Sequence, residues 1–468
     1  MTIVILCVIL LGFFIIATES IHHINKAAVA MFTGVLCWLL YIGYGTDYVT
    51  NEHGLDFSMF LSENQDSDLH LAKSFIAQNV FVRYINEAAQ VVFYLLSTMT
   101  IIEVLSNNGC FDFLKDWLRI RSARKFFWLL CLATFLLSLI LDNLTTVCLM
   151  LGIVRVLVKE ERLRWMFGGA IVITANVAGA ITVIGDSNTM LLWIKELVSP
   201  IMLTTKLLVP SIIGLTVVLL LISRKLPRTI TFQSTTPIYR GDDSLLKRWQ
   251  RTMMLVAGVG GLCFVPVFHY ITLLPPFVGA LCVLAFVWMV HELLNSSLLS
   301  AGQMSNMRKP LALQYDTLQN ILYFLGIYMS LSALVETGAL KDLLVYLSNS
   351  VASTSCLNVT LGLLSALFGN VCTLITSVSL FAQDSAALNP SFQSYFSVDG
   401  VFWPLLSYTT SFGGSLLTIG SVSGFSLMKM EGVTISWYFR HLTFKVLAGW
   451  ITGLIVFEII DTGFWLNI

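Results

Sequence analysis

The chain has few charged residues and no surplus of either sign. Asp, Glu, Lys and Arg make up 12% of its 468 residues, whereas a soluble domain has about 25%. Hydrophobic residues make up 56%, and the mean hydropathy is +0.82. This composition excludes an ordinary soluble domain and predicts an all-α polytopic membrane protein in contact with lipid. Because the formal net charge is +0, nothing indicates binding to a nucleic acid.

The chain also lacks the residue patterns of an enzyme or a resident metal. Its nine cysteines are scattered singly without a CxxC pair, and none of its seven histidines belongs to an HExxH motif. Scattered cysteines are expected to be small buried hydrophobic residues. We therefore expect a protein that is not an enzyme and has no cofactor. Residues 1–17 have no basic start and no cleavage site, so they are predicted to form a retained helix rather than a signal peptide.

One aspartate, Asp142, is the single charged residue in the apolar run from Phe126 to Val154. Basic residues collect on the cytoplasmic side of a membrane, so an ordinary span is basic at one end only. This run is basic at both ends, which predicts a hairpin that turns at Asp142 and leaves by the face it entered. Each arm is long enough, since half a bilayer core needs about 10 helical residues. A carboxylate at the tip indicates a functional site. The basic flanks are Arg119, Arg121, Arg124 and Lys125, then Arg155, Lys159, Arg162 and Arg164.

The distribution of charge also predicts which loops lie on which side. Residues 45–86 are acidic and are predicted to lie outside, whereas residues 224–251 are basic and are predicted to lie inside. No basic residue lies between Lys341 and Lys429. These charge constraints are all satisfied with both termini outside, provided that residues 356–382 form a second hairpin that enters from the outside face. Oppositely directed hairpins are what an inverted repeat produces.

Three blocks of sequence recur in the same order in the second half of the chain. Residues 94–109, 138–146 and 179–186 resemble residues 323–338, 365–373 and 414–421, at offsets of 229, 227 and 235. The last pair is rich in glycine and lies within the long apolar stretches 166–193 and 401–428. Polar residues around these blocks favour a broken helix. The alternative is a helix-packing surface of small residues.

The sequence thus predicts four parts in an inverted-repeat transporter. They are N-terminal helices and an acidic outside loop (1–70), a first repeat (71–225, hairpin 126–154, broken helix 166–193), a basic cytoplasmic loop with connecting helices (226–310), and a second repeat (311–468, hairpin 356–382, broken helix 401–428).

Two hairpin tips and two broken helices meet near the membrane midplane in such a repeat. Their carboxylate, amide and hydroxyl groups are hard oxygen ligands, which suit a hard cation rather than a transition metal. Burial disfavours a charged carboxylate, so a proton can also neutralise it. A site that holds either a cation or protons is the simplest antiporter. The predicted ligands are Asp142, Asn143, Thr145, Thr146, Asn176, Asp186, Thr189, Asn370, Ser415 and Ser421, with Asp142, Asn143, Asp186 and Asn370 on the sodium.

Two further acids lie in apolar helices. Glu103 and Glu336 are candidates for a proton path, and the alternative is that each is solvated near a membrane interface.

At these residues the chain resembles the NhaD-type sodium/proton antiporters of the ion-transporter superfamily, over residues 80–468. The resemblance implies exchange of sodium or lithium for protons, and a homodimer in which a mobile transport domain moves as an elevator against a fixed scaffold. It implies the bacterial inner membrane as the location. The matching pieces are Met99–Glu103, Leu141–Thr146, Ala175–Asp186, Gly413–Ser421 and Met430–Tyr438.

The second hairpin tip departs from this family, which usually has Asp-Asn where the chain has Gly369-Asn370. One intramembrane carboxylate is therefore absent, which predicts fewer protons per cation and leaves sodium coupling open.

The alternative function on the same fold is a sodium-coupled anion symporter, because helix N-termini at the midplane can hold an anion. Asp142 and Asp186 would repel such a cargo, which favours the antiporter.

Overall fold

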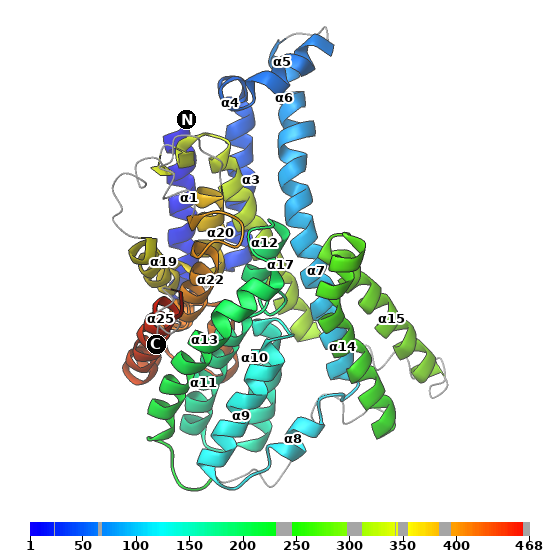
Figure 1. Ribbon diagram of the computed structural model, residues 1–468, viewed down its shortest axis with the longest axis vertical. Coiled ribbons are helices and arrows are strands. Elements are labelled where there is room, and N and C mark those ends of the chain that lie inside the picture. The colour runs from blue at the N-terminus through cyan, green and yellow to red at the C-terminus, as the bar shows by residue number, and fades with distance from the viewer. Residues whose placement is uncertain are drawn as a thin grey trace.

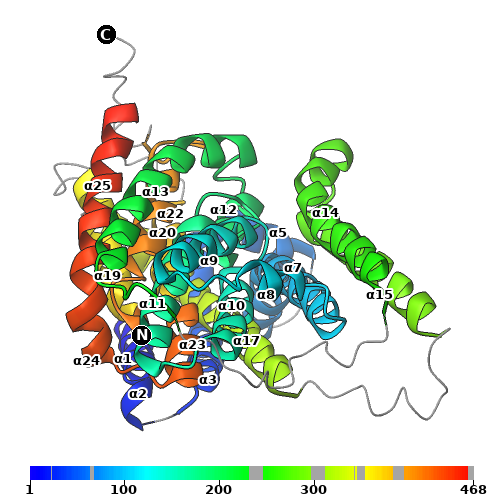
Figure 2. The same cartoon turned by 90° about the horizontal axis from the view of Figure 1, so that it is seen from below.

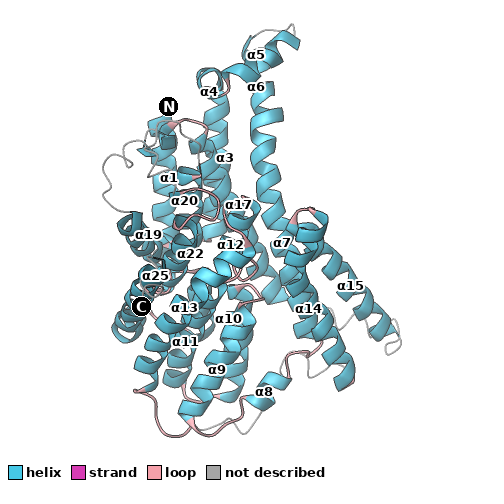
Figure 3. Ribbon diagram, viewed as in Figure 1, coloured by secondary structure: helices cyan, strands magenta, loops and turns pink. Residues whose placement is uncertain are grey.

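The computed structural model describes residues 1–22, 24–63, 68–230, 246–296, 311–341, 343–344, 354–382 and 395–461. The described residues form helices joined by loops and turns (Figure 3). The predicted all-α polytopic membrane protein is confirmed, because seven described segments are long and apolar enough to cross a membrane. These segments are Lys26–Gly43, Leu71–Asn107, Pro200–Ser223, Arg248–Thr272, Pro276–Leu294, Leu318–Val335 and Ile435–Asp461. Residues 231–245 and 297–310 of the predicted basic loop region lie outside the described residues.

The N-terminal helices pack against the middle of the chain through small residues. Gly34 and Gly326 let two helices approach closely, since a Cβ on Gly326 would lie 2.4 Å from the Ala30 carbonyl carbon. The two helices are α3 (Lys26–Gly43) and α17 (Leu311–Val335), and α1 (Thr2–Ala17) and α2 (Glu19–His22) precede them. One long segment follows, made of α6 (Asp68–Phe75), η1 (Ile76–Phe81) and α7 (Val82–Asn107), with α4 (Gly45–Glu52) and α5 (Gly54–Glu63) beside its start at one end of the molecule (Figure 1).

The central helices come in interrupted pairs. After α8 (Phe113–Trp117) the first pairs are α9 (Ala123–Ser138) with α10 (Asn143–Leu157), and α11 (Glu161–Gly179) with α12 (Ser187–Ile194). The later pairs are α19 (Thr354–Phe368) with α20 (Asn370–Phe381), and α22 (Phe402–Gly413) with η2 (Thr418–Gly420) and α23 (Val422–Glu431).

Uninterrupted helices surround these pairs. Gly214 and Gly449 bring two of them together, because a Cβ on Gly214 would lie 2.7 Å from the Gly449 carbonyl oxygen. They are α13 (Pro200–Ser223) and α25 (Phe444–Asp461), the latter preceded by α24 (Ile435–Tyr438) and η3 (Phe439–Thr443). Two more helices, α14 (Arg248–Thr272) and α15 (Pro276–Ser296), pack on α7 and on each other, and stand apart from the main body in both views (Figures 1 and 2).

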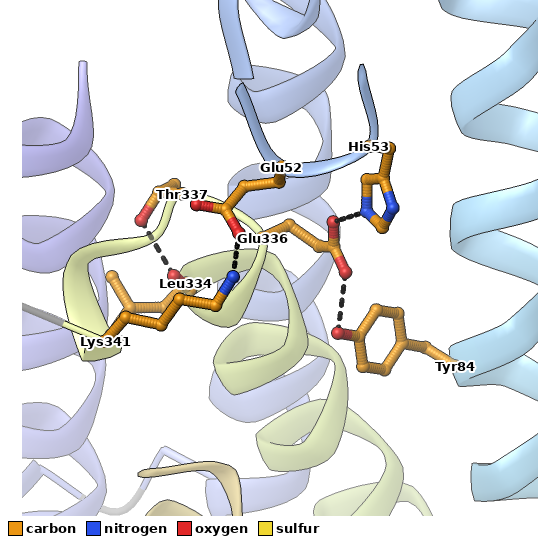
Figure 4. A network of polar contacts seen from close by, with 7 residues as sticks. All are labelled: Glu52, His53, Tyr84, Leu334, Glu336, Thr337 and Lys341. Carbon is orange, nitrogen blue, oxygen red and sulfur yellow. Dashed lines mark hydrogen bonds and ion pairs between the residues drawn. The ribbon is translucent and has the colours of Figure 1, made fainter. Parts of the chain in front are cut away.

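A buried carboxylate ties the end of α17 to α4 and α7 (Figure 4). Oε2 of Glu336 lies 2.7 Å from Nε2 of His53, and Oε1 accepts a hydrogen bond of 2.7 Å from the Tyr84 hydroxyl. Glu52 and Lys341 form an ion pair beside them. The acidic end of the molecule is thus fastened to the helices by charge pairs rather than by apolar packing alone.

The two partners shift each other's protonation. The hydrogen bond to Glu336 raises the pKa of His53, although burial opposes the shift. Burial alone would raise the pKa of Glu336, but the hydrogen bonds from His53 and Tyr84 outweigh it and lower that pKa. The pair is therefore charged on both sides at acidic to neutral pH, and it loses its charge as the pH rises through the raised pKa of His53.

We predict that this pair makes stability depend on pH. A histidine whose folded pKa is raised contributes stability below its unfolded pKa and loses that contribution as the pH rises through the folded pKa. His53→Gln should therefore flatten the fall in melting temperature as the pH rises above about 6.5, the ordinary pKa of histidine. Melting curves of detergent-solubilised protein measure this. His441→Gln is the control, because His441 is exposed and its ring contacts the carbonyl of Trp437, four residues earlier, rather than a carboxylate. An unchanged slope in His53→Gln would contradict the prediction.

Candidate functional site

Four helix breaks lie in the interior, at the positions where the sequence turns polar or glycine-rich. Glycine and short polar residues favour such ends, because the backbones can approach closely there. As the glycine-rich blocks predicted, α11 and α22 are interrupted rather than continuous packing surfaces. The breaks are residues 139–142, 180–186, 369 and 414–421.

Asp142 begins α10 and is 5% exposed. Its Oδ2 accepts a hydrogen bond of 3.1 Å from the Leu144 N–H, the arrangement expected of a helix N-cap. Its Oδ1 is buried and has no hydrogen bond within the part of the chain that is described. The same holds for Oγ1 of Thr146, one turn further along α10, whereas Thr145 is half-buried. A carboxylate and a hydroxyl oxygen are thus left for a ligand.

Asp186 begins α12 and is 3% exposed. Its oxygens accept hydrogen bonds from the Ser187 hydroxyl at 3.2 Å and the Asn188 amide at 3.0 Å. Its charge interacts with that of Asp142. Thr189, a predicted ligand, instead donates to the backbone carbonyl of Asp186 at 2.9 Å. Ser187 and Asn188 were not among the predicted site residues, although their place in the first turn of an apolar half-helix could have marked them.

Asn176, at the end of α11, joins three of the four breaks. Its Oδ1 accepts hydrogen bonds from the Asn143 amide at 3.2 Å and the Ser423 hydroxyl at 2.6 Å. Its Nδ2 donates to the Ser415 hydroxyl at 2.9 Å. Asn176 is fully buried, so these bonds are its means of satisfying a polar group away from water. Ser423 was not predicted, because nothing in the sequence places it beside a residue so far away in the chain.

Hydroxyl groups from neighbouring segments satisfy the freed carbonyls of the breaks. Tyr438 donates to the Ser415 carbonyl at 2.9 Å, and Thr443 donates to the Leu416 carbonyl at 2.6 Å. Ser407 does the same for Ala180 at 3.2 Å. Irregular backbone at membrane depth is tolerated where protein groups replace the missing helical bonds, and these donors meet that condition.

The second tip is built on one glycine and one asparagine. Gly369 has φ +94 and ψ 147, a conformation that favours glycine over any residue with a Cβ. The Asn370 side chain accepts a hydrogen bond of 3.0 Å from the Val371 N–H. Ser421 is buried and accepts bonds from the Gly424 N–H at 3.1 Å and from Ser423 at 3.2 Å. This half of the site therefore offers an amide and a hydroxyl, and neither tip residue supplies a carboxylate.

The two halves repeat the same contacts. The Ser138 hydroxyl donates to the Ala175 carbonyl at 2.9 Å, and the Ser365 hydroxyl donates to the Thr410 carbonyl at 2.9 Å. In each break two glycines meet: a Cβ on Gly179 would lie 2.9 Å from the Gly185 carbonyl oxygen, and one on Gly414 would lie 2.6 Å from that of Gly420. The recurrence follows the blocks of similar sequence.

The two candidate proton-path acids lie apart from these bonds. Glu103 is half-buried on α7, and Glu336 is engaged with His53 and Tyr84. A proton path through them stays a prediction.

The oxygen atoms at the breaks determine what the site can hold. Carboxylate, amide and hydroxyl oxygens are ligands for hard cations. No group of three or more His, Cys, Asp or Glu side chains with the geometry of a metal site occurs in the described part of the chain. Two carboxylates beside uncommitted oxygens suit a weakly held monovalent cation that can leave again.

The chain matches known membrane transporters over most of its length. The family model described as citrate transporter (CitMHS) matches residues 11–396. Sodium/proton antiporter 2 of Arabidopsis thaliana is 33% identical over 374 residues, which are 80% of this chain and 85% of that protein. Sodium/proton antiporter 1 of the same plant is 32% identical over 79% of this chain, which spans 61% of that protein's length. The Na(+)/H(+) antiporter NhaD of Vibrio cholerae is 26% identical over 81% of this chain and 80% of that protein.

These matches confirm the resemblance found in the sequence, and they agree with a transporter rather than an enzyme. The chain therefore belongs to the citrate-transporter (CitMHS) family of membrane transporters. Its sequence resembles those of NhaD-type sodium/proton antiporters.

Proposed function

We propose that this protein is an antiporter that exchanges sodium or lithium for protons. The observation that carries the proposal is the pair of buried carboxylates, Asp142 and Asp186, each at the start of a half-helix and electrostatically coupled to the other. The names of its relatives, sodium/proton antiporters of a plant and of bacteria, support the same function.

The chemistry follows from competition at one site. With Asp142 and Asp186 ionised, their oxygens and those of Asn188 and Thr146 replace the water shell of a sodium ion. Burying two negative charges without a cation is costly, so an empty site takes up protons instead. A proton on either carboxylate removes the charge that holds the cation. Cation and proton therefore exclude each other, and alternating access turns that exclusion into exchange.

We propose that α9–α10 and α19–α20 are re-entrant hairpins of an inverted repeat, entering from opposite faces. Each of these helices has 12 to 16 residues, whereas a full span needs about 20. The predicted range 126–154 lies within the span of α9 and α10, and the predicted range 356–382 ends one residue beyond α20. In this arrangement α3, α7 and α17 belong to the scaffold of an elevator in a homodimer, and both termini lie outside the bacterial inner membrane.

The alternative, a sodium-coupled anion symporter, is disfavoured by the same two acids. They would repel an anion at the breaks, where the helix N-termini would otherwise attract it.

Replacement of either acid should abolish exchange. Asp142→Asn and Asp186→Asn keep the shape of the side chain but remove the charge, so sodium-driven proton movement in proteoliposomes should fall to background. Asp116→Asn, at an exposed position on α8, is the matched control and should exchange normally. Size-exclusion profiles like that of the wild type would show that the loss is chemical. Near-normal exchange by Asp142→Asn would contradict the role proposed for this carboxylate.

The first hairpin should expose both of its ends to the cytoplasm. Single cysteines in place of Arg124 and Arg155, in a background without other cysteines, should both react with an impermeant maleimide added from the cytoplasmic side. The two positions flank α9 and α10 near their outer ends. Labelling of the two cysteines from opposite sides would show that α9 and α10 cross the membrane as one span, which would contradict the hairpin.

Exchange should respond little to voltage. Gly369 leaves the second tip without a carboxylate, so fewer protons accompany each cation than in relatives with an acid there. Moving one elementary charge across the membrane changes the free energy by about 2.3 kcal/mol per 100 mV. An exchange of one proton for one sodium ion moves no net charge, so the membrane potential would not drive it. A potassium-diffusion potential across wild-type proteoliposomes should leave the rate unchanged. A several-fold change with a negative interior would contradict this stoichiometry. Gly369→Asp is a poor test, because φ +94 strains any residue with a Cβ.

A further inference from the structure

Lys26, the first residue of α3, lies against the second half of the site. Its ammonium is 4.3 Å from the centre of the Phe425 ring and 5.0 Å from the centre of the Tyr323 ring. Phe425 lies in the first turns of α23, shortly after Ser421, and Tyr323 lies on α17. An ammonium at this distance is attracted by the faces of aromatic rings. The contacts hold the charge of Lys26 where α3 and α17 face α23.

Two cavities bring this ammonium to both tips. One is lined by Lys26 together with Gly369, Asn370 and Ser421. The other is lined by Lys26 together with Leu144, the neighbour of Asn143 at the first tip. They adjoin, because Lys26, Val422 and Phe425 line both. Lys26 is therefore a charged side chain beside both tips, that is, beside each half of the crossing of the four helix breaks.

The charges around the crossing are unequal. The first half has the carboxylates of Asp142 and Asp186, whereas the second half has Asn370 and Ser421 at its breaks. Helix N-termini add partial positive charge to both halves, those of α10 and α12 to the first and those of α20 and α23 to the second. Lys26 adds the positive charge of its ammonium beside the second half. A second cation would therefore be repelled there, and a cation at the two carboxylates would feel a weaker form of the same repulsion.

We propose that Lys26 sets the charge of the ion site and so tunes its affinity for both sodium and protons. It does not bind the ion. Its ammonium confines the cation to the Asp142–Asp186 side and lowers the affinity of those carboxylates for either positive partner. The inference rests on the proposed antiport. The other charged or titratable groups that line the cavities are Glu19 on α2, Tyr323 on α17 and Lys429 on α23.

Lys26→Met should lower the sodium concentration that gives half-maximal exchange. We expect a change of about three- to tenfold, the effect of one charge roughly 12–25 Å away at an effective dielectric constant of about 20. The carboxylates should also hold protons more tightly, so the rise of exchange with pH should move to higher pH. Glu19→Gln removes a negative charge from the second cavity, and should therefore change both quantities in the opposite direction.

Controls separate charge from packing. Lys26→Arg keeps the charge, so both quantities should stay near those of the wild type. Lys73→Met, at an exposed position on α6, should change neither. If Lys26→Met is poorly produced, Lys26→Gln answers the same question. An equal effect of Lys26→Arg and Lys26→Met would show that Lys26 acts by packing, and an effect of less than about twofold in both neutral variants would show that its charge does not reach the site.

A second readout separates this inference from the proposed function. Sodium binding to detergent-solubilised protein, followed by calorimetry, does not depend on exchange. Binding that is lost in Asp142→Asn but unchanged in Lys26→Met would overturn the role of Lys26 and leave the antiport standing. Absence of sodium binding and exchange in the wild type would instead remove the proposed function itself.

Discussion

The polar centre of this protein depends on one buried amide. Asn176 accepts from Asn143 and Ser423 and donates to Ser415, so it connects the start of α10, the end of α11 and the break between α22 and α23. Each of those segments interrupts a helix in the buried interior, where an unpaired backbone or amide group is costly. The breaks are therefore stable only together. The same bonds fix the distance between the half-helices that begin with Asp142 and Asp186.

Glycine contacts hold the surrounding helices close enough for those bonds to form. Gly34 with Gly326, Gly214 with Gly449, and Gly362 with Gly413 each bring the backbone of one helix against another. Hydrophobic burial does not drive association between helices in lipid, so close van der Waals packing has to supply the attraction. Larger residues at these positions would move the helices apart.

The site itself could be predicted in outline but not in its connections. Asp142 stood out as a lone charge in an apolar run, and the glycine-rich blocks gave the positions where α11 and α22 end. Ser423 did not stand out, because a hydroxyl in an apolar segment is more often a neutral part of a helix. The sequence made Glu336 a candidate for a proton path, which stays a prediction, but it gave no sign of the contacts with His53 and Tyr84 at the end of α17.

The sequence by itself determined that the chain enters a membrane, that its helices are interrupted at four polar or glycine-rich points, and that two carboxylates are buried there. Composition and local pattern suffice for this, because each is a property of consecutive residues. Only the tertiary structure decided which groups meet: Ser423 bonds to Asn176 across 247 residues of sequence, and Lys26 faces the second tip from a helix near the N-terminus. Such contacts depend on how helices cross in three dimensions. Local patterns in the sequence carry no record of that crossing.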